Sequence, residues 1–364
     1  MALSCGIIGL PMVGKTTFFN LLTGAGVETS AFFSGKTATN TAHALIPDDR
    51  VAYLSTMFKP KKTTYAQVEV IDVPGLARGA SQGIGTGNEF LTSVRTCDIL
   101  VHIVRAFAND EVIHAEETID ILRDIDIINS ELLFADLQLI ETRLSRINSG
   151  NKKKLEHPLE EQCLQKCQAF LEEEKPLRLL ELNEEEQEAL KHITFLTDKP
   201  MVIVVNVDEN QLIGNNYPDQ NQVQEYCTAQ HYELLIVSAK AEEEIEELPA
   251  EDQLVFLQEL QLNESGIARM AKALYHQLGL ISFLTAGTDE VKAWTIRKDL
   301  PAKQAAGKIH SDIERGFIRA ETVAFNDLKT AGSMAAAREK GYFRLEGKEY
   351  PVKDGDIINF RFNV

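Results

Sequence analysis

The chain has 364 residues, of which 44% are hydrophobic and 25% are charged, and its formal net charge is −18 at pH 7. This composition is typical of a soluble globular protein, and no apolar run reaches the ~20 residues that a membrane helix needs. A net charge this negative argues against a protein that coats nucleic acid non-specifically.

The first residues of the chain do not resemble a secretion signal. Met1 to Cys5 lead directly into a strand-like stretch, without a basic segment or a small-residue cleavage site. We therefore expect a cytoplasmic protein that does not bind membranes. The five cysteines are odd in number and have no recurring zinc-like spacing, so they do not indicate a disulfide framework.

Short apolar strands alternate with helix patterns in the first third of the chain and again after residue 198. Apolar strands separated by helices imply a mostly parallel sheet that is covered by helices on both faces. We therefore predict an α/β domain over residues 1–125 and 199–280. The expected strands are Cys5–Gly9, Gln67–Asp72, Ile99–Val104, Met201–Val205 and Leu234–Val237, and the first expected helix is Lys15–Thr23.

Residues 126–198 have a different pattern. Apolar residues recur at a spacing near 3.5 from Ile128 to Leu144, which predicts a long amphipathic helix. A break at Ser149–Lys154 separates it from a second helical stretch that reaches Leu171. Two long helices around a tight break predict a coiled-coil hairpin inserted between two strands of the sheet. Ordinary crossover helices are the alternative.

Residues 281–364 are expected to form a small separate α+β domain. Regularly placed glycines punctuate short runs there, with strands expected at Phe343–Leu345 and Ile357–Phe362 and a helical turn beginning at Ser311. This segment contains 14 Lys and Arg against 12 Asp and Glu, so its net charge is about +2 and the rest of the chain carries about −20. If the protein contacts RNA, this domain is the better candidate.

The run Gly9-Leu10-Pro11-Met12-Val13-Gly14-Lys15-Thr16 fits the P-loop pattern and lies between an apolar strand and a helix. Its glycines let backbone N–H groups face phosphate oxygens, Lys15 reaches the β and γ phosphates, and the Thr16 hydroxyl ligates Mg²⁺. The motif therefore predicts a P-loop nucleoside triphosphatase. The residues expected to contact the nucleotide here are Met12, Val13, Gly14, Lys15, Thr16 and Thr17.

Asp72-Val73-Pro74-Gly75 ends the next clear strand and fits the D-x-x-G element. In that element the Asp binds Mg²⁺ and the Gly N–H contacts the γ-phosphate, so Asp72 and Gly75 are predicted site residues. A plain Pro-Gly turn after a strand is the alternative. The Gly-rich stretch from Arg78 to Gly87 is typical of a switch segment that changes order with the bound nucleotide.

The segment predicted to face the base favours adenine over guanine. GTPases have N-K-x-D after the corresponding strand, where the Asp accepts two hydrogen bonds from guanine. Here Asn206-Val207-Asp208-Glu209 has Val in place of the Lys and Glu in place of the Asp. The longer carboxylate cannot keep that geometry, and a buried polar group left unpaired costs about 1–3 kcal/mol. We expect Asn206 and Glu209 to face the base, with Ser238 and Ala239 of an S-A-K element.

Leu76 follows D-x-x-G, where Ras-like GTPases carry the Gln that orients the attacking water. A leucine cannot orient water, so hydrolysis must be slow or must use another group. His114 is a candidate, because a neutral imidazole accepts a hydrogen bond from water. A surface histidine without a catalytic role is the alternative. The predicted catalytic residues are therefore His114 and Lys15.

Together these elements resemble the YchF family, the Obg-like ATPases, over nearly the whole chain. The likeness includes the P-loop segment, the Gly75–Asn88 stretch, Asn206 with Glu209, and Ser238-Ala239-Lys240. In the last part it includes Thr285–Gly287, Ala293–Thr295, Gln304–His310, Gly316–Glu321, Asp354–Asp356 and the final Phe360–Val364.

The resemblance implies a G domain, a helical coiled-coil insertion and a C-terminal, ubiquitin-like TGS domain. It also implies ATP preference through N-x-x-E, a hydrophobic residue in place of the catalytic Gln, and a catalytic histidine at the position of His114. Ribosomes are the implied partner, reached through the TGS and helical domains, with roles in translation or stress regulation. We also expect a monomer.

Two positions depart from the family pattern. Met12 replaces the Asn of the family P-loop, which puts potassium activation in doubt. The family's switch I Thr, a Mg²⁺ ligand, falls at Lys36 when counted without gaps, so Thr37 takes its place, or Thr39 does, or the ligand is absent. We favour Thr37, which makes Thr16, Thr37 and Asp72 the expected Mg²⁺ ligands.

Three functions are compatible with these residues. The first is an ATP-binding, slowly ATP-hydrolysing molecular switch that requires Mg²⁺ and associates with the ribosome or ribosomal RNA. The second is a GTP-binding GTPase of the Obg type, against which Val207 and Glu209 argue. The third is a scaffold that binds nucleotide for stability without significant turnover, against which Lys15, Thr16 and Asp72 argue.

Overall fold

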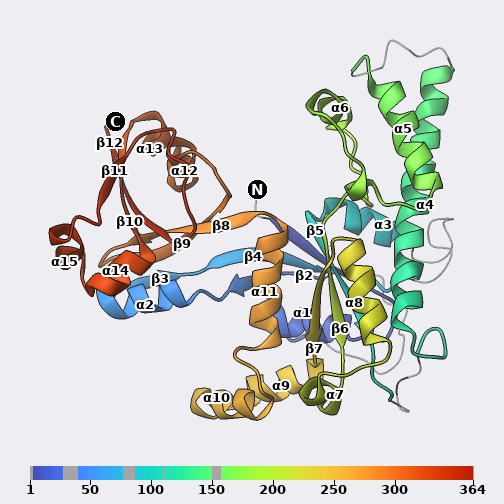
Figure 1. Cartoon of the computed structure of the whole chain (residues 1–364), viewed down its shortest axis with the longest axis horizontal. Coiled ribbons are helices and arrows are strands. Elements are labelled where there is room, and N and C mark those ends of the chain that lie inside the picture. Colours follow the sequence, from blue (N-terminus) through green and yellow to red (C-terminus); the bar gives the residue numbers. More distant parts are fainter. Residues whose placement is uncertain are drawn as a thin grey trace. The chain divides into compact units, whose positions relative to one another are not determined.

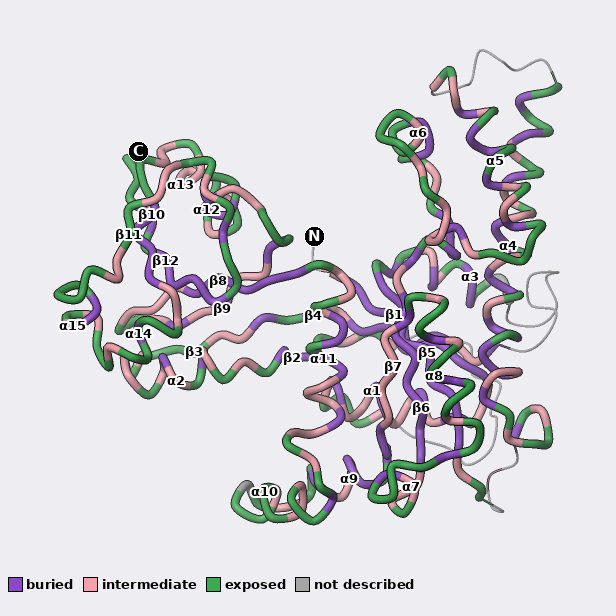
Figure 2. Tube along the Cα trace, in the orientation of Figure 1, coloured by how far each residue is buried: buried purple, intermediate pink, exposed green. Residues whose placement is uncertain are grey.

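The computed structural model describes residues 3–27, 40–76, 87–109, 112, 114–149 and 157–363. It divides into two compact units (Figures 1 and 2). Unit 1 comprises Met1–Ala44 and Glu69–Met270, and unit 2 comprises Leu45–Val68 and Ala271–Val364. Neither unit is therefore a single continuous segment of the chain.

Unit 1 is built on a six-stranded sheet. The strand pairs from β4 through β1, β5 and β6 to β7 are all parallel, and every residue of β1, β5 and β6 is buried. Buried apolar strands of this kind need helices on both faces, and the predicted α/β fold with a mostly parallel sheet is confirmed. The strands, in sheet order, are β2 (Asn40–Ile46), β4 (Ala66–Asp72), β1 (Ser4–Ile8), β5 (Ile99–Arg105), β6 (Met201–Asn206) and β7 (Glu233–Val237).

Helices connect these strands and pack on the sheet (Figure 1). Contacts join α1 to β1 and α9, α3 to β1, α4 to β5, and α8 to β7. Within the described ranges, no helix combines the length and the apolar character that crossing a lipid bilayer requires. The helices are α1 (Lys15–Thr23), α3 (Gly87–Thr96), α7 (Glu209–Gly214), α8 (Gln220–Ala229), α9 (Ala239–Glu247), α10 (Ala250–Glu259) and α11 (Gly266–Gln277), which begins in unit 1.

A helical segment lies in sequence between β5 and β6, as the sequence predicted. It contains α4 (Ile121–Asn148), α5 (Glu160–Glu172), the 3-10 turn η3 (Leu177–Leu179) and α6 (Glu184–Leu190). Helix α4 starts at Ile121, earlier than residue 126, because the Asp120 side chain caps it by accepting the Arg123 N–H. Helices α4 and α5 pack together around a shared core that includes Cys163 and Cys167.

A buried carboxylate ties this segment to the sheet. Asp136 of α4 is fully buried and accepts the N–H groups of Leu196 and Thr197, together with the Thr197 hydroxyl, at 2.8–2.9 Å. These donors lie just before β6. The contact helps to explain why the helical segment belongs to unit 1, whereas the sequence suggested a separate part over residues 126–198.

Unit 2 contains a second six-stranded sheet of mixed direction. Strand β10 pairs antiparallel with β11 and β12, and β8 pairs antiparallel with β9, whereas β12 and β8 pair in parallel. Its core includes Phe283, which stacks on Trp294 with ring centroids 6.2 Å apart and meets the edge of Phe360. The strands, in sheet order, are β11 (Arg344–Glu346), β10 (Phe317–Ala324), β12 (Asp356–Phe362), β8 (Leu280–Ala286), β9 (Glu290–Arg297) and β3 (Lys62–Thr64). The helices are α2 (Asp49–Phe58), α12 (Ala302–Ile309), α13 (Ser311–Arg315), α14 (Phe325–Ala331) and α15 (Met334–Glu339).

Residues 45–68 belong to this second unit, although the sequence division placed them with the first 125 residues. Strand β3 pairs in parallel with β9, and α2 packs against β8 and β9. Arg50 of α2 also forms an ion pair with Asp354, at 2.7 Å. No local pattern in residues 45–68 predicts these contacts, because the strands and the side chain that residues 45–68 contact lie more than two hundred residues away along the chain.

Candidate nucleotide-binding site

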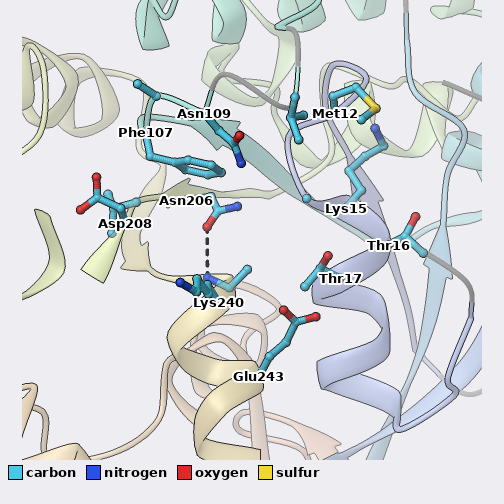
Figure 3. A pocket seen from close by; sticks show the side chains of 15 residues that line it. Met12, Lys15, Thr16, Thr17, Phe107, Asn109, Asn206, Asp208, Lys240 and Glu243 are labelled. Carbon is cyan, nitrogen blue, oxygen red and sulfur yellow. Dashed lines mark hydrogen bonds between the residues drawn. The ribbon is translucent and has the colours of Figure 1, made fainter. Parts of the chain in front are cut away.

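The loops after β1, β5, β6 and β7 surround a cavity of about 510 Å³ in unit 1 (Figure 3). Carboxyl ends of neighbouring parallel strands meet at one edge of a sheet, which is where ligands bind in such folds. Among the predicted nucleotide contacts, those that line the cavity are Met12, Gly14, Lys15, Thr16, Thr17, Asn206 and Ala239. Val13, Gly75, Glu209 and Ser238 do not line it.

The P-loop backbone follows a path that glycine makes possible. Gly9 and Gly14 have φ angles of 147° and 102°, and a Cβ on Gly9 would lie 2.5 Å from the Ile103 carbonyl oxygen. Met12 also has a positive φ, of 65°. Asn adopts that region more readily than Met does, so the replacement noted in the sequence leaves Met12 in a backbone conformation that is uncommon for its type.

Lys15 is 8% exposed, and its Nζ donates a hydrogen bond to the Leu10 carbonyl at 2.8 Å. Burial lowers the pKa of Lys15 to about 8, and the nearby Asp72 carboxylate opposes that shift. A cation taken out of water in this way gains from any anion that enters the cavity. Lys15 lies at one side of the cavity in Figure 3, next to Thr16.

Thr16 and Asp72 meet beside the P-loop, since the Thr16 hydroxyl donates to Asp72 Oδ2 at 3.0 Å. Burial raises the pKa of Asp72, whereas Lys15 and the hydrogen bond from Thr16 lower it. A hydroxyl and a carboxylate are the hard oxygen donors that Mg²⁺ prefers, and Mg²⁺ needs few protein ligands when phosphates supply the rest. These two residues therefore fit the predicted metal. Thr37, the third predicted ligand, lies outside the described residues.

Gly75 approaches the P-loop closely. A Cβ at this position would lie 3.1 Å from Lys15 Nζ and 3.3 Å from Pro11 Cα, so a larger residue would push against both. Leu76 is 1% exposed, and its N–H donates to the Gly9 carbonyl at 3.3 Å. The leucine therefore packs in the core beneath the P-loop and offers no polar group to a reacting water.

Asn206 joins two loops of the cavity. Its Nδ2 donates to the Val13 carbonyl at 3.0 Å, and its Oδ1 accepts the Ala239 N–H at 3.1 Å, which is the dashed line in Figure 3. Ser238 caps α9 by accepting the Ala241 N–H and is fully buried. Asn206 and Ser238 thus hold the loops in place, and Ala239 reaches the cavity surface.

Asp208, rather than Glu209, lines the cavity. Asp208 is the N-cap of α7, and its side chain accepts the Gln211 N–H at 2.9 Å. Glu209 is the first residue of that helix and is half-buried. Figure 3 shows Asp208 at the side of the cavity away from Lys15, which is where a base would lie if phosphates occupied the P-loop.

Sequence reasoning missed several residues that line the cavity. Phe107, Ala108, Asn109 and Val112 follow the end of β5, and Lys240 and Glu243 come from the first turns of α9. The position of β5 beside β1 could have drawn attention to them, because loops after adjacent parallel strands share an edge. Nothing in their residue types alone signals a nucleotide.

Arg105 holds the loop that follows β5. This guanidinium is 2% exposed and donates to the carbonyls of Phe107, Asn109 and Val112 at 2.9, 3.3 and 2.9 Å. It also lies 4.7 Å from the centre of the Phe107 ring. A planar group with five donors suits several carbonyls at once, so Arg105 shapes one wall of the cavity.

His114 lies in the core instead of lining the cavity. It is 6% exposed, its Nε2 is 3.0 Å from Asp124 Oδ2, and its Nδ1 accepts the Glu116 N–H at 3.1 Å. Both ring nitrogens therefore face protein groups. A catalytic role would require His114 to turn away from Asp124, and that role stays a prediction.

Comparison with known proteins identifies the family. The chain is 44% identical to the "Ribosome-binding ATPase YchF" of Bacillus subtilis (strain 168), and the alignment covers 100% of both chains. It is 42% identical to the protein of that name from Escherichia coli O157:H7, again over the full length of both. This chain belongs to the YchF family. The sequence prediction of the family is thereby confirmed.

Other relatives of this YchF chain agree with that assignment. It is 38% identical to "Obg-like ATPase 1" of Gallus gallus, with 100% of this chain and 93% of that protein covered. The structure of the Schizosaccharomyces pombe YchF GTPase superposes with a TM-score of 0.83, at 32% identity over 99% and 97% of the two chains. Two family models also match: "50S ribosome-binding GTPase" at residues 4–135, and YchF-GTPase_C, described as "Protein of unknown function (DUF933)", at residues 280–363.

Replacing Arg105 by Met should open the wall formed by the Phe107–Val112 loop. Arg105→Met leaves three carbonyls without their donor, so we expect faster amide exchange in that loop and a loss of nucleotide affinity of about tenfold. Amide hydrogen exchange and titration with a fluorescent nucleotide measure the two effects. Arg95→Met is the matched control, because Arg95 donates to a single carbonyl, that of Thr194. Equal effects of the two variants would contradict the assigned role.

Proposed function

We propose that this chain binds ATP together with Mg²⁺, hydrolyses it slowly, and acts as a molecular switch on the ribosome in translation or stress regulation. The observation that carries the proposal is that Lys15 and Thr16 line the cavity side by side and that the Thr16 hydroxyl donates to Asp72. The names of the relatives, "Ribosome-binding ATPase YchF", support it. We also propose that the protein works as a monomer in the cytoplasm.

The residues divide the work along the cavity. Lys15 and the P-loop N–H groups bind and orient the phosphates, with the Lys15 charge opposing the charge that builds up during transfer. Thr16 and Asp72 would hold Mg²⁺, with Thr37 as the proposed third ligand. The metal would supply neutralisation of the phosphate charge. Gly75 would donate its N–H to the γ-phosphate, and Ser238 and Asn206 keep the loops in position.

Adenine preference rests on the side of the cavity that Asp208 and Phe107 line. Val207 is an apolar residue where GTPases have Lys, and Glu209 begins α7 where they have the Asp that accepts from guanine. Either Asp208 or Glu209 can accept a hydrogen bond from the adenine 6-amino group after a small movement of the loop. Guanine lacks an amino group at that position and so gains nothing from such an acceptor.

Measuring the affinities for ATP and GTP tests the base preference. We expect ATP to bind at least tenfold more tightly, because a mispaired polar group at the base costs about 1–3 kcal/mol. Glu209→Asp with Val207→Lys, which rebuilds the GTPase pattern, should narrow or reverse the difference. Tighter binding of GTP by the unaltered chain would instead favour the Obg-type GTPase. Absence of any ATP turnover with ribosomes present would favour the third function, a scaffold that binds nucleotide without hydrolysing it. The buried Leu76 is compatible with that function, because it offers no polar group to a reacting water.

Nucleotide affinity should fall at alkaline pH. The pKa of Lys15 is about 8 in the protein alone, and phosphate oxygens raise it, so the complex keeps a proton that the free protein gives up above that pH. The affinity for MgATP should therefore be full below pH 8 and fall by up to about tenfold per pH unit above it. The Lys15→Arg variant stays charged over this pH range. Its affinity for MgATP should be weaker than that of the unaltered chain but should not change with pH. A flat profile for the unaltered chain would contradict the shifted pKa.

His114→Ala should slow turnover without weakening ATP binding. A positioned general base contributes about 10²–10⁴-fold, so we expect kcat to fall by that factor while the Kd for ATP stays constant. Single-turnover hydrolysis and equilibrium titration measure the two quantities. Glu117→Gln, an exposed change three residues away, is the control. Unchanged kcat in His114→Ala would remove the histidine from the mechanism.

Ribosome contact is proposed through the helical segment and the C-terminal TGS domain. The basic residues near the start of that domain include Lys292, Arg297, Lys298 and Lys303. One of them is already engaged, because Lys292 Nζ lies 3.7 Å from the centre of the Trp294 ring. The near-balanced charge of residues 281–364 makes contact with an anionic surface possible there, while most of unit 1 carries negative charge.

A further inference from the structure

Helix α10 of unit 1 carries an apolar run that the described structure covers only in part. Leu254-Val255-Phe256-Leu257 are four consecutive apolar residues, and Leu254 and Val255 are 65% and 55% exposed. Phe256 and Leu257 are only half-buried. The first buried residue after them is Leu260, beyond the end of the helix. Figure 2 shows α10 largely in the colour of exposed residues.

This run differs from the other exposed apolar residues of the chain. Large apolar side chains that face solvent singly are ordinary, and within the described ranges Phe134, Ile213 and Leu345 are of that kind. Leu254 and Val255 are the two exposed large apolar residues that are adjacent in sequence there. Adjacent exposed apolar residues form a contiguous apolar patch, and such patches mark surfaces that are used for binding.

The charge around α10 restricts what can bind. Residues 241–268 contain nine Asp and Glu and no Lys, Arg or His. Glu243, Glu246 and Glu247 of α9, and Glu251 and Asp252 of α10, are all exposed. A nucleic-acid backbone would be repelled by these carboxylates. A protein segment with lysines or arginines beside apolar side chains complements both features.

Helix α9 connects this surface to the nucleotide cavity. Its first turns supply Lys240 and Glu243 to the cavity lining, and its last residue is followed by Leu248 and Pro249, which lead into α10. The segment between α9 and α10 is held by a hydrogen bond, in which the Gln253 side chain donates to the Leu248 carbonyl at 3.0 Å. A partner held on α10 would thus lie at the far end of a helix whose start faces the nucleotide.

We propose that the apolar run Leu254–Leu257, with the exposed carboxylates of α9 and α10, is a docking surface for a basic, partly apolar segment of a partner protein. This inference rests on the proposed ribosome association, and we assign the segment to a ribosomal protein rather than to ribosomal RNA. The surface gives the acidic unit 1 a means of contact with the ribosome that is separate from the basic residues of the C-terminal domain.

Photo-crosslinking from the full chain tests this assignment. Val255 is replaced by p-benzoyl-phenylalanine, and the chain is pelleted with ribosomes from Bacillus subtilis in the presence of ATP and then irradiated. Samples are treated with ribonuclease before denaturing electrophoresis. We expect a heavier band that survives ribonuclease and contains a ribosomal protein. A band that ribonuclease removes, or one at the mass of two copies of this chain, would overturn the proposal.

Pelleting also separates this proposal from the proposed function. A chain that pellets with ribosomes but gives no cross-link from position 255 would support the ribosome association and contradict the proposed docking surface on α10. A chain that does not pellet at all would overturn both.

Surface variants measure the contribution of the apolar run. Leu254→Ser with Val255→Ser should weaken ribosome binding about tenfold, and Glu246→Gln with Glu247→Gln should weaken it and reduce its dependence on salt. Both pairs are exposed, so folding should be unaffected. Ile213→Ser is the matched control, because it removes an exposed apolar side chain, 44% exposed, from α7 of unit 1, outside the helical segment and the C-terminal domain. Equal binding by the Leu254→Ser/Val255→Ser variant and the control would contradict the proposal.

Discussion

The side-chain amide of Asn206 is the contact on which the site depends. One end of it donates to the Val13 carbonyl of the P-loop, and the other accepts the Ala239 N–H at the start of α9, just after the loop that follows β7. Both partners are buried backbone groups, and a buried backbone group without a partner is costly. The same residue ends β6, where its carbonyl accepts the Ala106 N–H at the start of the loop after β5. One residue thus sets the spacing of three loops around the cavity.

Much of unit 1 could be predicted from local patterns. The apolar runs at the β1, β5 and β6 positions are buried on both faces, and such strands are visible in a sequence without any knowledge of their neighbours. Helix α1 was predicted at its observed limits, because Gly14 begins it and Gly24, with a φ of 64°, ends it. The second unit was harder. Strands β8, β9 and β10 went unpredicted, because each depends in part on a strand elsewhere in the chain: β8 and β10 pair with β12, and β9 pairs with β3.

The residues of the site also divide into those that local sequence patterns predict and those that only the fold brings together. Lys15, Thr16 and Asp72 belong to motifs whose chemistry demands those residue types, and the structure brings them together. Phe107, Asn109 and Glu243 belong to no such motif, and they line the cavity because of where β5 and β7 end. His114 illustrates the opposite case. Its residue type suggests chemistry, yet its position against Asp124 depends on the first turn of α4, which cannot be read from the histidine itself.

The placement of residues 45–68 has a consequence for how the chain can be divided. These residues leave unit 1 within β2, supply α2 and β3 to the second unit, and return to unit 1 within β4. The second unit therefore cannot be removed or transferred as residues 280–363 alone. Such a fragment would lack α2 and β3, and the remaining chain would keep both elements without the strands on which they pack. A fragment that is to fold like the second unit has to carry the internal segment together with the tail.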